Sequence, residues 1–134
     1  MNYTTRIIKF RAWDKKHKMW LDDFFIDLNG DMWEYDNSEG NMNKLGAYEP
    51  VNIVLMQFTG LRDKNGKEIY EGDIVKIEGD MMVSDWNCEV KFEDGMFIPL
   101  VTVEEGYNAI DSYCQKRFEV IGNIYETPEL LKIK

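Results

Sequence analysis

Hydrophobic and polar residues alternate along much of the chain with a period of two, the pattern of a strand that has one buried face. Residues 6–13 form the first such stretch and residues 88–93 form another. In the first stretch, the alternation predicts a buried face made of Ile8, Phe10 and Ala12 and an exposed face made of Ile7, Lys9, Arg11 and Trp13. In the second, it predicts that Cys88, Val90 and Phe92 are buried. The pattern therefore predicts a mainly β protein.

Two Asn-Gly pairs mark predicted hairpin turns. Asn29-Gly30 lies between two short apolar stretches, and Asn65-Gly66 follows the apolar residues 51–58. Both residue types tolerate positive φ, which a type I′ turn requires at its two central positions. We therefore expect a type I′ hairpin at Asn65-Gly66, after which the chain enters a strand over residues 74–77.

The other stretches complete the predicted elements. The polar residues 36–48 are expected to form a loop, or a boundary between an N-terminal β-layer and the rest of the chain. Pro99 lacks an amide donor and so predicts an edge strand, and Gly122 predicts a bend within an apolar strand. Thr127 and Pro128 suit the N-cap and first turn of a short C-terminal helix.

Short strands joined by Gly-bearing turns, without alternating helices, predict a small barrel. The 134 residues suit a single domain. Within it we expect residues 1–50 to form an N-terminal β-layer of hairpins with a loop, and residues 51–134 to form the barrel.

The composition describes an ordinary folded chain, with 44% hydrophobic and 13% aromatic residues. No apolar stretch approaches the length of a membrane span, and the first residues lack the apolar segment of a signal peptide. Two cysteines are too few for a disulfide framework. We therefore expect a cytosolic protein without a membrane partner.

The net charge of −9 is unevenly distributed. Residues 1–20 carry six bases and one acid, for a net charge of +5, whereas the rest of the chain carries ten bases and 24 acids, for a net charge of −14. An acidic body repels nucleic acid at long range and favours a basic partner. The basic start could bind phosphates locally, or could rest against the acidic body of its own chain or of a neighbour.

Aromatic residues inside the basic region add a second hypothesis. Proteins that bind single-stranded nucleic acid combine base stacking with phosphate attraction. Trp13 is the candidate for stacking because the alternation places it beside the basic side chains, although large aromatics in small β proteins usually belong to the core. The candidate contacts for nucleic acid or another partner are Arg6, Lys9, Arg11, Trp13, Lys15 and Lys16.

Candidate catalytic and metal-binding residues are few. His17 is the single histidine and lies among lysines. The acidic loop that begins at Asp27 lacks the glycine that an EF-hand needs at its sixth position, where Met32 stands. The sequence therefore predicts no catalytic residues, no metal site and no cofactor, and we expect a protein that is not an enzyme.

Three blocks of sequence stand out from the rest. They are residues 8–14 (Ile-Lys-Phe-Arg-Ala-Trp-Asp), residues 55–75 with their Phe-Thr-Gly-Leu and Tyr-Glu-Gly-Asp-Ile-Val segments, and residues 119–131 with Val-Ile-Gly-Asn-Ile-Tyr-Glu and Pro-Glu-Leu-Leu. Together, in this order, they resemble the YopX family of small phage and prophage proteins. The resemblance implies a largely β fold built around an SH3-like barrel, with self-association, and it implies no known activity.

These observations predict a phage- or prophage-encoded protein of uncharacterised function that acts by binding. The first hypothesis is a non-catalytic protein-interaction module with an acidic surface, bound to itself or to a host or phage protein. The alternative is a nucleic-acid-binding accessory protein that uses the basic N-terminal strand and turn.

Overall fold

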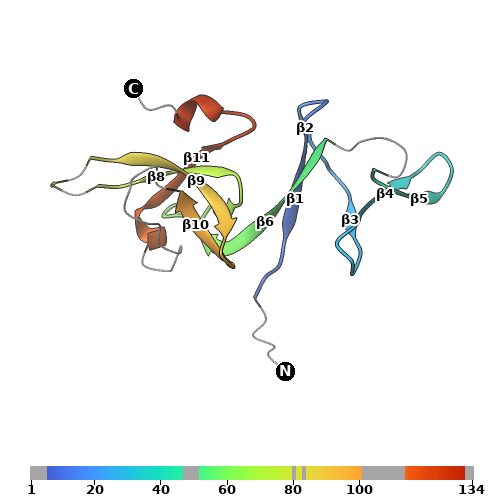
Figure 1. The fold of residues 1–134 in the computed structure, drawn as a ribbon, viewed down its shortest axis with the longest axis horizontal. Coiled ribbons are helices and arrows are strands. Elements are labelled where there is room, and N and C mark those ends of the chain that lie inside the picture. The colour runs from blue at the N-terminus through green and yellow to red at the C-terminus, as the bar shows by residue number, and fades with distance from the viewer. Residues whose placement is uncertain (1–5, 47–51, 80, 83, 101–113, 132–134) are drawn as a thin grey trace. The chain divides into compact units, whose positions relative to one another are not determined.

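The computed structural model describes residues 6–46, 52–79, 81–82, 84–100 and 114–131, and it confirms a mainly β protein (Figure 1). The strands in these residues are β1 (Phe10–Asp14), β2 (Met19–Trp20), β3 (Phe25–Ile26), β4 (Met32–Asp36), β5 (Asn41–Lys44), β6 (Ile53–Arg62), β7 (Glu68–Tyr70), β8 (Asp73–Ile77), β9 (Trp86–Glu93), β10 (Met96–Leu100) and β11 (Phe118–Asn123). Two 3₁₀ helices, η1 (Cys114–Arg117) and η2 (Pro128–Leu131), flank β11 in sequence.

The chain divides into two compact units. One is discontinuous in sequence and combines Met1–Phe10 with Met56–Lys134, whereas the other, the inserted unit, is Arg11–Leu55. The division at residue 50 within one domain stays a prediction. In the structure, the described residues 6–10 belong to the same compact unit as the residues from Met56 onward.

The discontinuous unit contains an antiparallel sheet in the order β10-β9-β8-β11. β10 lies at an edge, as the missing amide donor of Pro99 predicts. Strand β8 is the most deeply buried, because Ile74 and Val75 have no exposed surface and Ile77 is only 5% exposed. The core cluster on this sheet consists of Ile69, Val75, Ile77, Cys88, Val90, Phe118 and Val120, with Trp86 packed against it.

Strand β9 confirms part of its predicted pattern. Cys88 and Val90 are buried, but Phe92 is 52% exposed and the expectation that it is buried was wrong. Phe92 lies near the turn into β10, where its ring meets Phe97 edge-on at a centroid distance of 5.0 Å. The alternation of apolar and polar residues in the sequence extends to Phe92, although the strand has left the core after Val90.

The hairpin at Asn65-Gly66 is confirmed, but its turn is not type I′. Gly66 has a φ of +84°, whereas Asn65 stays outside the left-handed region. The Asp63 amide donates to the Lys67 carbonyl at 2.8 Å and the Gly66 amide donates to the Asp63 carbonyl at 3.0 Å. This is a three-residue loop that places only its last residue at positive φ, a common alternative to the two-residue turn.

The carboxylate of Asp63 holds this loop together. Its Oδ1 accepts the amides of Asn65 and Lys67 at 2.8 and 2.9 Å, and its Oδ2 accepts the amide of Val120 in β11 at 2.9 Å. Burial alone would raise the pKa of Asp63, but the three amide bonds outweigh it and leave the pKa below its ordinary value. The carboxylate therefore joins the hairpin to the strand.

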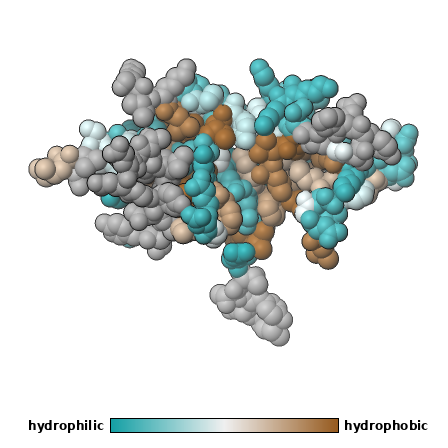
Figure 2. Space-filling view, viewed as in Figure 1, coloured by the Kyte–Doolittle hydropathy of each residue, from teal (hydrophilic) through white to brown (hydrophobic). Residues whose placement is uncertain are grey.

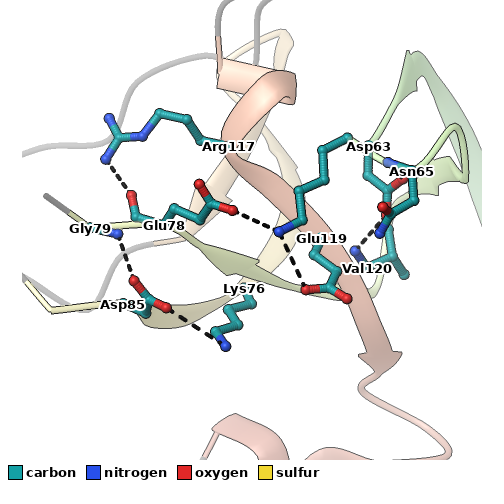
Figure 3. Close-up of polar contacts among 10 residues, drawn as sticks. Asp63, Asn65, Lys76, Glu78, Gly79, Asp85, Arg117, Glu119 and Val120 are labelled. Atoms are coloured by element: carbon teal, nitrogen blue, oxygen red, sulfur yellow. Dashed lines mark hydrogen bonds and ion pairs between the residues drawn. The ribbon is translucent and has the colours of Figure 1, made fainter.

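A surface network lies beside this contact (Figure 3). The Lys64 ammonium lies 2.6 Å from Glu78 and 3.8 Å from Glu119, and Arg117 donates to the Glu78 carbonyl. Exposed ion pairs of this kind contribute little each, so the core and the Asp63 bonds provide most of the stability here.

Gly122 confirms the predicted irregularity in β11. The pairing of β11 with β8 shifts register between Val120 and Gly122. A Cβ at Gly122 would lie 1.9 Å from the Thr127 hydroxyl and 3.0 Å from a Leu130 methyl, so no side chain fits. The predicted C-terminal helix is the single 3₁₀ turn η2.

The inserted unit differs more from the sequence predictions. Residues 36–48 were expected to form a loop, but they contain β5, which pairs with β4. The faces of the first predicted strand also differ. Ala12 and Trp13, in this unit, are both buried, whereas Ile8 and Phe10, which belong to the discontinuous unit and were expected to be buried, are 56% and 38% exposed. Trp13 lies directly opposite Trp20 on β2, and this pairing places it in the interior of the unit.

Candidate functional site

Lys9 is already engaged within the discontinuous unit. Its ammonium lies 2.7 Å from Glu68 and 5.7 Å from the centroid of the Phe58 ring. Its carbonyl accepts the Phe58 amide at 2.9 Å. A phosphate at Lys9 would therefore have to compete with an ion pair. Arg6, at the start of the described chain, is exposed.

Arg11 and Trp13 are both committed to Trp20 in the inserted unit. The Arg11 guanidinium lies 4.7 Å from the centroid of the Trp20 ring, and Trp13 meets that ring edge-on at 4.9 Å with an interplanar angle of 71°. Only 7% of Trp13 is exposed. The position predicted to stack on a base is thus part of a buried aromatic pair.

The turn between β1 and β2 presents the exposed lysines Lys15, Lys16 and Lys18. Asp14 closes this turn, because its Oδ1 accepts the amides of Lys16 and His17 and its Oδ2 lies 2.7 Å from His17 Nδ1. The hydrogen bonds from His17 hold the pKa of Asp14 below its ordinary value. His17 therefore has a structural explanation as a partner in a turn.

The sheet β3-β4-β5 of the inserted unit presents a second candidate surface, which the sequence analysis missed. Phe25 lies opposite Trp33, and Tyr35 lies opposite Met42. Because side chains at facing and alternate positions share one side of a sheet, these four residues lie on one face. Phe25, Tyr35 and Met42 are 53%, 52% and 43% exposed. We call this set the apolar face.

Two polar groups on the side of the sheet that carries the apolar face, those of Trp33 and Lys44, are paired within the unit. Trp33 Nε1 donates to Asp27 Oδ2 at 3.0 Å, which holds the pKa of Asp27 below its ordinary value. Lys44, which faces Trp33 across the strands, lies 3.0 Å from Asp31. The face therefore combines exposed apolar surface with polar atoms that already have partners.

The loop from Asp27 to Asp31 joins β3 to β4 and repeats the geometry of the Asp63 loop. The Asp27 amide donates to the Asp31 carbonyl at 2.9 Å, and the Gly30 amide donates to the Asp27 carbonyl at 3.0 Å. Asp27 Oδ1 accepts the amides of Asn29 and Asp31. Leu28 occupies the position held by Lys64 in the other loop, and it is fully exposed.

A recognisable signal for this surface exists in the sequence. Trp33 and Tyr35 alternate with polar residues, and residues 21–43 contain seven acids and no base. From their sequence, these residues were expected only to form hairpins and a loop.

Cys88, like His17, has a structural explanation. Cys88 is 1% exposed, and burial raises the pKa of its thiol to about 11, so the thiol is protonated at neutral pH. In the described part of the chain, no group of three or more acidic, histidine or cysteine side chains is arranged to hold a metal ion. Nor does any helix in those residues have the length and apolarity to cross a membrane.

Comparison with known proteins agrees with the resemblance seen in the sequence. The family model of the YopX protein matches residues 9–132. The SPbeta prophage-derived uncharacterized protein YopX of Bacillus subtilis (strain 168) is 29% identical over 133 residues, which cover 92% of this chain and 95% of the relative.

Two crystal structures also match. That of YopX from Bacillus subtilis gives a TM-score of 0.64 at 30% identity, over 96% of this chain and 100% of the other. That of a protein from Enterococcus faecalis gives a TM-score of 0.60 at 30% identity, with the same coverage. The chain belongs to the YopX family.

Proposed function

We propose that this protein is a phage- or prophage-encoded, cytoplasmic protein-interaction module that binds a basic protein through an acidic surface and has no catalytic activity. The prophage origin of its Bacillus subtilis relative, an uncharacterized protein, supports the first part. The observation that carries the binding role is the combination found in residues 21–43, a stretch with seven acids and no base that also contains exposed apolar side chains.

Charge and exposed apolar surface favour the same kind of partner. A net charge of −9 attracts a basic protein and repels nucleic acid at long range. Exposed aromatic and methionine side chains that adjoin one another are typical of protein interfaces.

A binding role also fits the state of the reactive groups. The Cys88 thiol is buried and protonated, and His17 is held by Asp14 in a surface turn. Catalysis by a thiolate would need a thiol with a lowered pKa, the opposite of what burial does to Cys88.

Nucleic-acid binding is the second candidate function, and the turn after β1 favours it. Asp14 fixes this turn, so that Lys15 and Lys16 are presented on an ordered backbone. Screening by salt limits the repulsion from acids more than about 8 Å away, so a local basic patch could still bind phosphate.

Affinity purification of the tagged full chain from cells of an infected host tests both candidates, with the bound material identified as protein or nucleic acid. We expect to recover a basic protein. Its recovery should persist after nuclease treatment and should be unchanged with the Lys15→Glu, Lys16→Glu variant. Recovery of nucleic acid alone, lost in that variant, would reverse the order of the two candidates.

The salt dependence of binding provides a quantitative check. If the turn binds single strands, the logarithm of affinity should fall with the logarithm of salt by roughly 0.7 for each phosphate contacted. At physiological salt we expect single-stranded DNA or RNA either not to bind or to bind non-specifically, with a dissociation constant in the sub-millimolar to millimolar range. A micromolar dissociation constant there would contradict the proposed function.

A further inference from the structure

A comparison of two similar loops in this chain indicates a docking role for Leu28. The loops at Asp27 and Asp63 have the same backbone hydrogen bonds, yet the second loop carries the charged Lys64 where the first carries Leu28. The loop geometry therefore does not require an apolar residue at this position. A fully exposed leucine gains nothing from folding, and apolar residues of this kind serve as anchors in interfaces.

The apolar face continues from this loop. Phe25 precedes the loop in β3, and Trp33 and Tyr35 follow it in β4. Figure 2 shows hydrophobic atoms at the surface where the β3–β4 loop lies. Tyrosine, tryptophan, phenylalanine and methionine are enriched in the cores of protein interfaces, and this face holds all four types.

The polar atoms of the face favour burial by a partner. Trp33 Nε1 is satisfied by Asp27, and the charge of Lys44 is compensated by Asp31. A partner that covers the face therefore leaves neither of these two groups without its hydrogen bond or counter-charge.

Acidic residues around the face determine the charge of its partner. Asp22 and Asp23 precede β3, and Glu39 lies in the turn between β4 and β5, whereas Glu34 and Asp36 alternate with the aromatic residues of β4 and so lie on the opposite side of the sheet. Charges at the rim of an interface act mainly by steering the partner and excluding those of like charge. The partner must therefore be basic.

We propose that the apolar face, with Leu28, is the docking surface for a protein segment that carries both basic and apolar side chains. This inference rests on the proposed function and assigns it to one sheet. Leu28, Phe25, Tyr35 and Met42 contact the apolar side chains of the partner, and the carboxylates of Asp22, Asp23 and Glu39 attract its lysines or arginines.

Two synthetic peptides of equal length and equal positive charge test this docking surface. One carries leucine and tryptophan at alternate positions, and the other carries serine at those positions. Each is titrated into the ¹⁵N-labelled full chain, and amide chemical shifts are followed by NMR. We expect the apolar peptide to bind more tightly and to shift the amides of residues 25–28, 33–35 and 42.

Matched variants separate docking from general hydrophobicity. Leu28→Gln removes the apolar anchor at a position where the equivalent loop tolerates Lys64, so folding should be retained. Met81→Gln is the control, because Met81 is also fully exposed but lies between β8 and β9. We expect Leu28→Gln to weaken binding of the apolar peptide by about tenfold and Met81→Gln to leave it unchanged.

The outcomes distinguish this inference from the function on which it rests. Equal binding of the two peptides, shifts confined to other residues, or equal effects of the two variants would overturn the docking surface while leaving an acidic interaction module intact. No binding of either peptide, together with recovery of nucleic acid instead of protein from host cells, would overturn both. Concentration-dependent self-association that shifts the same amides without any peptide would assign the surface to a second copy and contradict the proposed partner.

Discussion

Asp63 and Val120 are 57 residues apart in sequence and are joined by a hydrogen bond of 2.9 Å from the Val120 amide to Asp63 Oδ2 (Figure 3). The same carboxylate closes the hairpin that follows β6, through the amides of Asn65 and Lys67. One buried acid thus determines both the local turn and the position of β11 relative to it. Replacing Asp63 leaves amide donors without an acceptor. The free-energy penalty of these unpaired donors exceeds the net stability that the hydrogen bonds contribute.

We therefore expect Asp63→Asn to lower the free energy of unfolding by about 2–3 kcal/mol at neutral pH, because hydrogen bonds to a charged acceptor are stronger than those to an amide. Chemical denaturation of both proteins measures the difference. Asp27→Asn is the control, since Asp27 closes an equivalent loop but bonds no distant strand, and it should cost less.

The Asp63 contribution should also depend on pH in a defined direction. Its folded pKa is lowered, so the stabilisation is complete above the unfolded value of about 3.9 and is lost as pH falls through the folded pKa. The stability difference between wild type and Asp63→Asn should accordingly be constant above about pH 5 and shrink below pH 4. A difference that grows on acidification would contradict this assignment.

Gly122→Val should destabilise the protein by about 1–3 kcal/mol, because the added side chain has no room beside Thr127 and Leu130. The denaturation midpoint is the measurement. In a Thr127→Ala background the same substitution should cost less, since the closest atom to the new Cβ is the Thr127 hydroxyl oxygen. An unchanged midpoint in the wild-type background would show that the strand shifts to accommodate the side chain.

Trp13→Ala should lower the stability of the folded protein, whether or not it also changes binding. Truncating a buried tryptophan that packs against Trp20 is expected to cost about 3–5 kcal/mol. Thermal unfolding followed by circular dichroism tests this, with Lys15→Ala as an exposed control expected to change stability by less than about 0.5 kcal/mol. A variant with normal stability but weakened affinity for single strands would instead support the stacking hypothesis.

Cys88 should be unreactive in the folded protein. With a thiol pKa of about 11 and 1% exposure, it presents almost no thiolate to an alkylating or disulfide reagent at pH 8. In a Cys114→Ser variant, labelling should be absent under native conditions and complete in denaturant. Rapid labelling of the native variant would show that β9 opens locally.

The sequence predicted best where local chemistry determines structure. The Asn65-Gly66 loop depends on a glycine at positive φ and on an adjacent aspartate, and both are visible in a few residues. The irregularity at Gly122 is similarly local, although its cause, the position of Thr127, is visible only in the folded chain.

The errors arose where packing between distant residues decides the outcome. Trp13 in β1 is buried because it faces Trp20 in the neighbouring strand β2. A period-two pattern within one strand does not reveal such a contact between strands. Strand β5 is exposed along its length, so it carries no hydrophobic alternation from which it could be predicted. The apolar face was missed for a related reason, because exposed apolar residues in sequence resemble core residues.

The strand order β10-β9-β8-β11 has a consequence for synthesis of the chain on the ribosome. Strand β8, the most deeply buried, receives its second neighbour only when β11 has been made, after both β9 and β10. Until then the amide and carbonyl groups along one side of β8 remain unpaired, at an open edge that another nascent chain can pair with. Strand β11 therefore protects the most deeply buried strand of this sheet from pairing with another chain.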